Sequence, residues 1–314
     1  MEGGIQMQLE NKLTILVNTC DGYEDLWMPF FTLLKRYWNP QGIPILLNTE
    51  SREFSMDGLD ITCVHAPRSR YYGERMLYAV SRVKTEYVLL LLDDFFLRQT
   101  VQTERIHQIL SWMEVDRNIA CFNTEAIPVY ADWERDRYPG FCRVPPGTAY
   151  ALNMQAALWR TDMLKRYWKP KVSPWEWEAY CNLLQYKFPH QKIYCTTDCR
   201  HSFLDYGHRK VGDVWAVVRG KWVLEDVQPL FEKENIAVDL SKRDAYVPGQ
   251  PAAQQEDTRS GWYQLLLRSL GVEGVVWYLA YKVYYKLCCL AGKECNPDFM
   301  LWLSDNARKK FLKE

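Results

Sequence analysis

The feature that most constrains the fold is a short apolar run that ends in two acidic residues. Residues 86–92 (EYVLLLL) are almost wholly apolar and lead directly into Asp93 and Asp94. A run of this length and composition is typical of a strand buried on both faces of a sheet. The sequence therefore predicts a buried strand that delivers two carboxylates to a sheet edge.

Similar runs alternate with segments of helical periodicity through the first half of the chain. Further strands are expected at 13–18 (LTILVN), 43–48, 60–65 and 119–122, and helices at 25–38, 74–83 and 101–113. Strands and helices that alternate with short connections predict an α/β fold, a doubly wound and mostly parallel sheet with helices on both faces. The residues between 125 and 150 have the composition of long loops.

The second half of the chain is less regular and divides by composition. We expect a catalytic domain over 1–245, with one half at about 13–122 and another at about 150–245. Residues 246–257 have linker composition, and 258–314 are expected to form a C-terminal helical region.

An apolar, aromatic tract at 261–290 is expected to be helical and broken near Gly271 and Gly274. Its most apolar part contains Lys282 and Lys286, and is too short and too charged to span a bilayer. Peripheral contact with a membrane is one interpretation. Packing on the catalytic domain or on a second subunit is the other, and the oligomeric state is left open.

Composition excludes some functions and leaves others open. With 314 residues, 48% of them hydrophobic, the chain can bury a large core, and a formal net charge of +0 argues against a nucleic-acid partner. The start, MEGGIQMQLENK, lacks the pattern of a secretory signal, and ten irregularly spaced cysteines are typical of reduced thiols, so a cytoplasmic protein is expected. A zinc site at Cys195, Cys199 and His201 is disfavoured because a CxxC spacing and a clear fourth ligand are missing.

Acidic residues follow three of the expected strands. Asp21, Glu50 and the pair Asp93–Asp94 all lie just past strand ends, which is where parallel sheets bind ligands. Two adjacent carboxylates at a buried strand end are costly without a counter-charge, and oxygen ligands of this kind suit Mn²⁺ or Mg²⁺ bound with substrate phosphates. A paired Asp can instead cap a helix.

A second candidate site is the segment 173–178 (SPWEWE). Ser173 and Pro174 fit the N-cap and first turn of a helix. Glu176 and Glu178 then point in different directions, so one of them is expected to face a cleft and act as a general base. The alternative is that a Glu in the first turn only stabilises the helix dipole.

Together these segments resemble a known family. VLLLLDDFFL is similar to the strand and DxD-type motif of GT-A glycosyltransferases, and TILVNTCDGYEDLW with ILLNTES resembles their nucleotide-binding unit. The succession GERMLYAVSRVKTEYVLLLLDDFFL, NMQAALWR, SPWEWE, RGKW and NIAVDLSKRDAY resembles bacterial capsular or surface-polysaccharide glycosyltransferases. The resemblance covers roughly 13–247 and excludes the C-terminal tract.

The resemblance implies roles for individual residues. Asp94 would coordinate the metal, Asp93 would reach the ribose or the metal, and the contiguous pair leaves their division of labour open. Glu178 would be the base, with Glu176 as fallback. Further implied contacts are His201 to the metal, His208 as its weaker alternative, Thr19, Asp21 and Glu50 to the nucleotide, Arg75 to the donor, and Arg219 and Lys221 to the leaving diphosphate. Arg75 could equally lie on a solvated helix face, and RGKW could be a solvated hairpin.

The expected activity is transfer of a sugar from a nucleoside-diphosphate-sugar to a hydroxyl of a glycan or lipid-linked glycan. We expect the transfer to invert the anomeric carbon and to be assisted by Mn²⁺ or Mg²⁺. The expected role is in surface polysaccharide synthesis, at the inner face of the membrane if the C-terminal tract touches it. A sugar nucleotidyltransferase is an alternative, although VNTCDGYED is acidic where that class carries a Gly-rich phosphate loop. A non-catalytic glycan-binding or assembly subunit is the other alternative.

Overall fold

The computed structural model describes residues 9–69, 71–126, 137–144, 148, 151–188, 190–197, 202–205, 216–248 and 262–293. Within these residues, one eight-stranded sheet has the strand order β3-β2-β1-β4-β7-β5-β8-β6. Its strands are β1 (Leu13–Asn18), β2 (Ile45–Asn48), β3 (Ile61–Cys63), β4 (Tyr87–Leu92), β5 (Ile119–Ala126), β6 (Phe141–Arg143), β7 (Ala157–Arg160) and β8 (Lys192–Thr196). Only β6 and β7, among the described strands of this sheet, run antiparallel to their neighbours.

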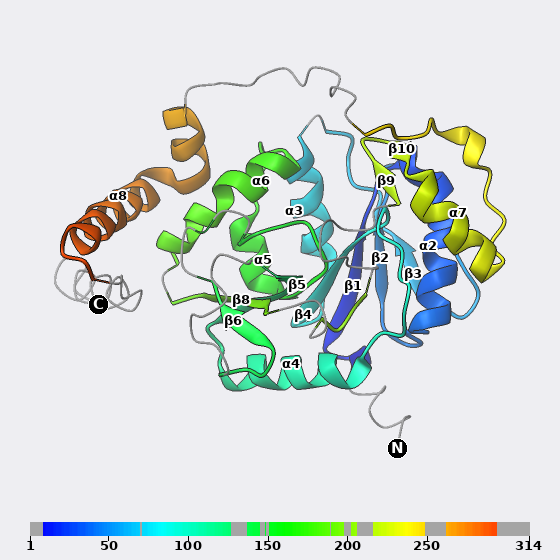
Figure 1. The fold of residues 1–314 in the computed structure, drawn as a ribbon, viewed down its shortest axis with the longest axis horizontal. Helices are drawn as coiled ribbons and strands as arrows, with labels where there is room; N and C mark the ends of the chain where they lie inside the picture. Colours follow the sequence, from blue (N-terminus) through cyan, green and yellow to red (C-terminus); the bar gives the residue numbers. More distant parts are fainter. Residues whose placement is uncertain are drawn as a thin grey trace.

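Helices cover both faces of this sheet (Figure 1). The longer helices are α2 (Glu24–Tyr37), α3 (Tyr72–Arg82), α4 (Thr103–Val115), α5 (Thr161–Tyr167), α6 (Pro174–Tyr180), α7 (Leu224–Glu234) and α8 (Trp262–Leu290). Short 3₁₀ turns are η1 (Asp21–Tyr23), η3 (Cys181–Tyr186) and η5 (Leu240–Lys242). The prediction of an α/β, Rossmann-like, doubly wound and mostly parallel sheet is confirmed.

The central strands are apolar throughout because each one contributes to two cores. In β4, Leu89 and Leu91 pack with α2, α4 and α7, whereas Val88 and Leu90 pack with α3, α5 and α6. Side chains on a strand alternate between faces, so a strand buried on both sides shows no polar alternation. The uniform apolar run at 86–92 follows directly from this position.

A small hairpin stands apart from the main sheet. Its strands β9 (Val217–Val218) and β10 (Lys221–Trp222) are joined by Arg219 and Gly220, whose φ angles of 54° and 76° are those of a tight two-residue hairpin turn. Trp222 is fully buried, so the hairpin is anchored on the core while the turn lies at the surface. The interpretation of RGKW as a hairpin is therefore confirmed.

Helix α8 lies against η3 through tilted contacts between tyrosine rings. The ring of Tyr186 lies 5.9 Å from that of Tyr278 and 4.8 Å from that of Tyr281. The helical conformation is interrupted at Gly271, with φ 66° and ψ 176°, and not at Gly274. No helix in the described part of the chain is long and apolar enough to cross a membrane.

Candidate functional site

The candidate site lies where β1, β2 and β4 end side by side. Asn18, the last residue of β1, is in register with Asn48 of β2 on one side and with Leu92 of β4 on the other. The residues that follow these strands, among them Thr19, Glu50 and Asp93, are therefore gathered at one sheet edge. Parallel pairing produces the cluster that the sequence predicts.

Asp93 is held firmly at this edge. It is 3% exposed, and its Oδ2 accepts a hydrogen bond from the hydroxyl of Thr19. The Thr19 oxygen in turn accepts from the indole Nε1 of Trp27 at 2.7 Å. Burial raises the pKa of Asp93 well above its usual range, and the neighbouring charge of Asp94 raises it further. The hydrogen bond from Thr19 opposes this effect, because it stabilises the carboxylate form that burial disfavours.

Asp94 has an oxygen with no partner. Its backbone carbonyl accepts from the N–H of Ala216 at 3.2 Å, but its Oδ1 is buried and has no hydrogen-bond partner among the described residues. Burial raises the pKa of Asp94 to about 7, against a lowering influence from the guanidinium of Arg243. An orphaned carboxylate oxygen beside a second carboxylate fits a hard divalent cation. Asp93 and Asp94 are thus residues that could hold Mn²⁺ or Mg²⁺.

The other residues considered as metal ligands lie outside the described part of the chain. His201 and Cys199 fall in the gap between 197 and 202, and His208 falls between 205 and 216, so their placement stays a prediction. No group of three potential ligands occurs among the described His, Cys, Asp and Glu residues. Cys195, the remaining member of the disfavoured zinc cluster, lies buried in β8 with its Sγ 3.5 Å from that of Cys142.

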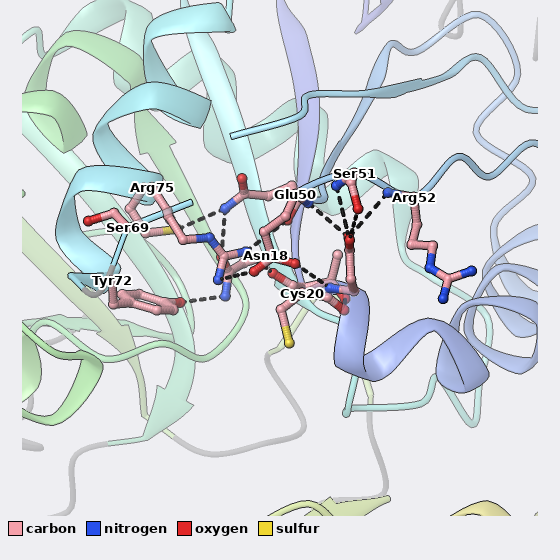
Figure 2. Close-up of polar contacts among 12 residues, drawn as sticks. Asn18, Cys20, Glu50, Ser51, Arg52, Ser69, Tyr72 and Arg75 are labelled. Atoms are coloured by element: carbon pink, nitrogen blue, oxygen red, sulfur yellow. Dashed lines mark hydrogen bonds and ion pairs between the residues drawn. The ribbon is translucent and has the colours of Figure 1, made fainter. Parts of the chain in front are cut away.

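Asp21 organises the loop after β2, which carries Glu50, Ser51 and Arg52 (Figure 2). Its carboxylate accepts hydrogen bonds from the backbone N–H groups of Glu50, Ser51 and Arg52 and from the Ser51 hydroxyl, the last at 2.6 Å. Burial on its own raises the pKa of Asp21, but these hydrogen bonds hold it well below its usual value. The Asp21 side chain therefore fixes the backbone of residues 50–52 at the edge of the site.

Arg75 ties helix α3 to the same edge. Its Nη1 lies 2.9 Å from Oε1 of Glu50, and its Nη2 donates to the backbone carbonyls of Thr19 at 2.9 Å and Asn48 at 3.3 Å. The Arg75 side chain is only 12% exposed. The alternative that Arg75 lies on a solvated helix face is therefore wrong, and its guanidinium joins the ends of β1 and β2.

Two open pockets flank Asp21. One, of about 380 Å³, is lined by Asp21, Glu50, Arg68 and Ser69. The other, of about 690 Å³, is lined by Asp21, Gly22, Glu24, Asp25, Arg219, Gly220, Lys221, Lys242, Arg243 and Asp244. The hairpin thus brings Arg219 and Lys221 to the same pocket as Asp21, with the Lys221 amine 4.0 Å from the Asp244 carboxylate.

Arg243 is a site residue that the sequence reasoning missed. Its guanidinium forms a bidentate ion pair with Asp25, at 2.7 and 2.6 Å, and donates to the carbonyl of Gly22 at 2.7 Å. It also lies over the ring of Tyr23, 4.3 Å from the centroid. The segment NIAVDLSKRDAY was part of the family resemblance, but nothing in its spacing singles out this arginine.

Glu178 lies on α6 and is half-buried. Its Oε1 accepts from the backbone N–H of Met154 at 2.7 Å, and burial raises its pKa. The phenol of Tyr72 accepts from Asn18, and burial raises the Tyr72 pKa well above its usual value. The charge of Arg75 lowers this pKa, and those of Asp94, Asp93 and Glu178 raise it. Tyr72, also missed from the sequence, therefore lies within electrostatic reach of both acidic groups.

Glu176 has a structural role. Its Oε2 accepts from the backbone N–H of Ser173 at 2.8 Å, and its own N–H donates to the Ser173 hydroxyl at 3.2 Å. This reciprocal pair is a capping box that closes the N-terminus of α6. The prediction of Ser173 as N-cap is confirmed, and the helix-end interpretation fits Glu176 better than the role of fallback base.

Comparisons with known proteins add a fold-level likeness only. No family model and no curated protein matches the sequence. Among solved structures, the chain is similar to residues 1–349 of TarS from S. aureus, at 14% identity and a TM-score of 0.36 over 60% of this chain and 58% of that one. The structure of the same protein with UDP-GlcNAc is similar at 13% identity and a TM-score of 0.41, over 74% of this chain and 68% of that one.

A further solved structure, the bifunctional IspDF from Campylobacter jejuni, matches at 10% identity and a TM-score of 0.28, over 50% of this chain and 42% of that one. The chain therefore spans less than two thirds of the first TarS structure and of IspDF. Likeness at this level supports no conclusion about activity, which has to be derived from the site itself.

Proposed function

We propose that this chain is a GT-A-type glycosyltransferase that moves a sugar from a nucleoside-diphosphate-sugar to an acceptor hydroxyl. The observation that carries the proposal is the Asp93–Asp94 pair at the end of β4. Among the described residues, Asp94 supplies the only buried carboxylate oxygen that has no hydrogen-bond partner. A divalent cation with a diphosphate completes the charge balance at such a position.

The donor would lie along the edge formed by β1, β2 and β4. The pocket between Asp21 and Ser69 suits the nucleoside, because the hydrogen bonds of Asp21 to residues 50–52 give it fixed walls. Mn²⁺ or Mg²⁺, held by Asp94 and Asp93, would neutralise the diphosphate oxygens when bound. Arg219 and Lys221 line the neighbouring pocket and supply positive charge where the leaving diphosphate accumulates it.

The acceptor would meet Glu178. A half-buried carboxylate with a raised pKa, held by one backbone N–H, suits a general base that removes the acceptor proton. Trp175 lies one helical turn before Glu178, on the same side of α6, and its ring is 63% exposed. An exposed indole beside the base offers a sugar ring a stacking surface. Attack from the side opposite the diphosphate would invert the anomeric configuration, and a glycan or lipid-linked glycan of surface polysaccharide synthesis is the acceptor class.

The first experiment measures donor binding and tests the acidic pair. Thermal shifts are recorded with UDP-, GDP-, CMP- and dTDP-sugars, with and without Mn²⁺, for the wild type and for Asp94→Asn. One sugar nucleotide is expected to raise the Tm of the wild type in the presence of Mn²⁺, since a ligand that binds only the folded state stabilises it by about 2.7 kcal/mol at a hundredfold excess over Kd. Asp57→Asn, an exposed aspartate in a loop, is the matched control. Mn²⁺-dependent shifts that survive in Asp94→Asn would refute the metal role of Asp94.

The second experiment tests the base with a matched pair of variants on one helix. Glu178→Gln is expected to lower the transfer rate by about 10²-fold or more while donor binding stays unchanged. Glu176→Gln is the control, because Gln also closes a capping box and α6 stays intact. A loss confined to Glu176→Gln would move the base to that residue. Pyrophosphate release from a nucleoside triphosphate and a sugar phosphate would instead identify a sugar nucleotidyltransferase, and absence of any nucleotide affinity would favour the glycan-binding or assembly subunit.

A further inference from the structure

Helix α8 has an apolar surface that no described part of the protein covers. Val272, Val276, Leu279, Val283, Leu287 and Leu290 are between 54% and 77% exposed. Their spacings of three and four residues place them on one face of the helix, and we call this row the apolar strip. The strip extends about 27 Å at 1.5 Å per residue. An exposed apolar surface of this size and continuity is typical of an interaction site.

The opposite face of α8 is the one that packs on the domain. Tyr278 is 8% exposed and Tyr281 is half-buried, and both contact Tyr186 of η3. Because this face fixes the helix on the domain, the apolar strip points outward. The expectation that the helix packs on the catalytic domain therefore holds for one face and leaves the other without a partner in the described structure.

Positive charge borders the apolar strip along one side. Lys282 and Lys286 are both exposed, and the Lys282 amine lies 5.6 Å from the ring centroid of Tyr278, between the strip and the packed face. Glu273 is the only acidic residue between 267 and 293, and it lies at the end of the strip beside the Gly271 break. An apolar face flanked by lysines is the pattern of a helix that lies in the plane of an anionic lipid surface.

A second copy of the chain fits this charge pattern less well. In an antiparallel pair of helices, equivalent flanks face each other, so Lys282 and Lys286 of one copy would lie near those of the other. In a parallel pair in register, they would face the uncharged Tyr284 and Cys288, whereas Glu273, on the same flank as Tyr284, lies about 13 Å before Lys282 along the helix axis. An anionic membrane fits better, because lipid phosphates would pair with the lysines while the apolar strip is buried among the acyl chains.

We propose that the apolar strip of α8 docks the protein in the plane of an anionic membrane. Since the helices of the described residues do not cross a bilayer, the contact is peripheral, with the strip at the level of the acyl chains and the lysines at the headgroups. The contact does not depend on the proposed glycosyl transfer.

The test uses the full chain in sedimentation with sucrose-loaded vesicles of phosphatidylcholine, with and without one third phosphatidylglycerol. The wild type is expected to bind the anionic vesicles more tightly than the neutral ones, and less tightly at high salt. Val276→Asp combined with Val283→Asp should weaken binding at least about tenfold, because the apolar valine side chains that would be buried among the acyl chains are replaced by charged ones. Val115→Asp, at a valine that is 89% exposed at the end of α4, is the matched control and should bind like the wild type.

A second pair of variants tests the charge. Lys282→Glu with Lys286→Glu should lower affinity for anionic vesicles by about 25-fold or more, at about fivefold for each lysine removed, and leave binding to neutral vesicles unchanged. Lys84→Glu, at an exposed lysine before β4, is the control. Circular dichroism melts establish that all variants fold.

Several results would overturn the proposal. These are no binding of the wild type to anionic vesicles, equal binding by the strip variant and Val115→Asp, or a wild-type dimer in sedimentation velocity that the strip variant loses. The last result would assign the strip to a second copy.

Discussion

Disrupting the ion pair between Arg75 and Glu50 tests whether this pair stabilises the candidate site. The Arg75 and Glu50 side chains are 12% and 17% exposed, and Arg75 also donates to the carbonyls of Thr19 and Asn48. Arg75→Met removes these donors and leaves a shielded carboxylate whose remaining donor is the N–H of Asp21. We expect a loss of about 2–3 kcal/mol in the free energy of unfolding, somewhat below the 3–5 kcal/mol typical of fully buried pairs.

The assay is urea unfolding of the wild type, Arg75→Met, Glu50→Gln and the double variant. Because the double variant no longer contains an unpaired carboxylate, its loss should fall short of the sum of the single losses by about 1–2 kcal/mol. The control cycle uses Arg166 and Asp162 on α5, an exposed pair at 3.6 Å that should show a coupling of about 0.3 kcal/mol. A coupling energy between Arg75 and Glu50 as small as that of the control would show that solvent screens this ion pair. The pair would then not stabilise the site.

Two further predictions concern the framework. The pKa of Glu234 is lowered to about 2 by hydrogen bonds from Tyr37 and Arg36, so its contribution is present above the ordinary pKa of 4.5 and is lost as pH falls towards 2. Glu234→Gln should therefore lower stability by about 1–2 kcal/mol at pH 7 and by much less near pH 2, measured as Tm against pH, and a pH-independent difference would contradict this. Gly73→Ala would place a Cβ 1.9 Å from the backbone oxygen of Lys169, so the loop before α6 must move; we expect a loss of about 1–3 kcal/mol in urea unfolding, and an unchanged midpoint would refute the close approach.

The first half of the fold was predictable because its signals are local. The expected strands at 13–18 and 86–92 correspond to β1 (Leu13–Asn18) and β4 (Tyr87–Leu92). Parallel strands that are buried on both faces must be uniformly apolar, and their carboxyl ends must meet at one edge. The gathering of Asp21, Glu50 and Asp93 follows from these two rules alone.

The second half was less predictable because long-range pairing decides it. Strand β7 has four residues and inserts antiparallel between β4 and β5, with Leu158 opposite Leu89 on one side and Phe122 on the other. A run as short as ALWR does not predict which strands it pairs with, because the pairing depends on residues far away in the sequence. Arg243 was missed for the same reason, since its partner Asp25 lies more than two hundred residues earlier.

One local signal was present and was underused. Ser173 and Glu176 have the S-x-x-E spacing of a capping box, which assigns the Glu176 carboxylate to the helix end. The resemblance already implied Glu178 as the base and Glu176 as the fallback, and the capping box supports that order. A local hydrogen-bonding motif therefore gives a physical reason for the order of two neighbouring carboxylates that the resemblance to a family only implied.

Asp93 and Asp94 differ in whether their carboxylate oxygens have hydrogen-bond donors among the described residues, and this difference indicates different roles. Asp21 and Asp93 have their carboxylates engaged, the first by the backbone of 50–52 and the second by Thr19. Folded proteins satisfy nearly all buried polar groups, so a buried carboxylate oxygen without a donor among the described residues is a candidate ligand for a bound cation. Among the described residues, Asp94 has such an oxygen. Its neighbour Asp93 accepts from Thr19, which in turn accepts from Trp27, and these bonds fix the end of β4. We therefore infer that Asp93 acts mainly in positioning and Asp94 in ligation, a division that the contiguous Asp-Asp motif left open.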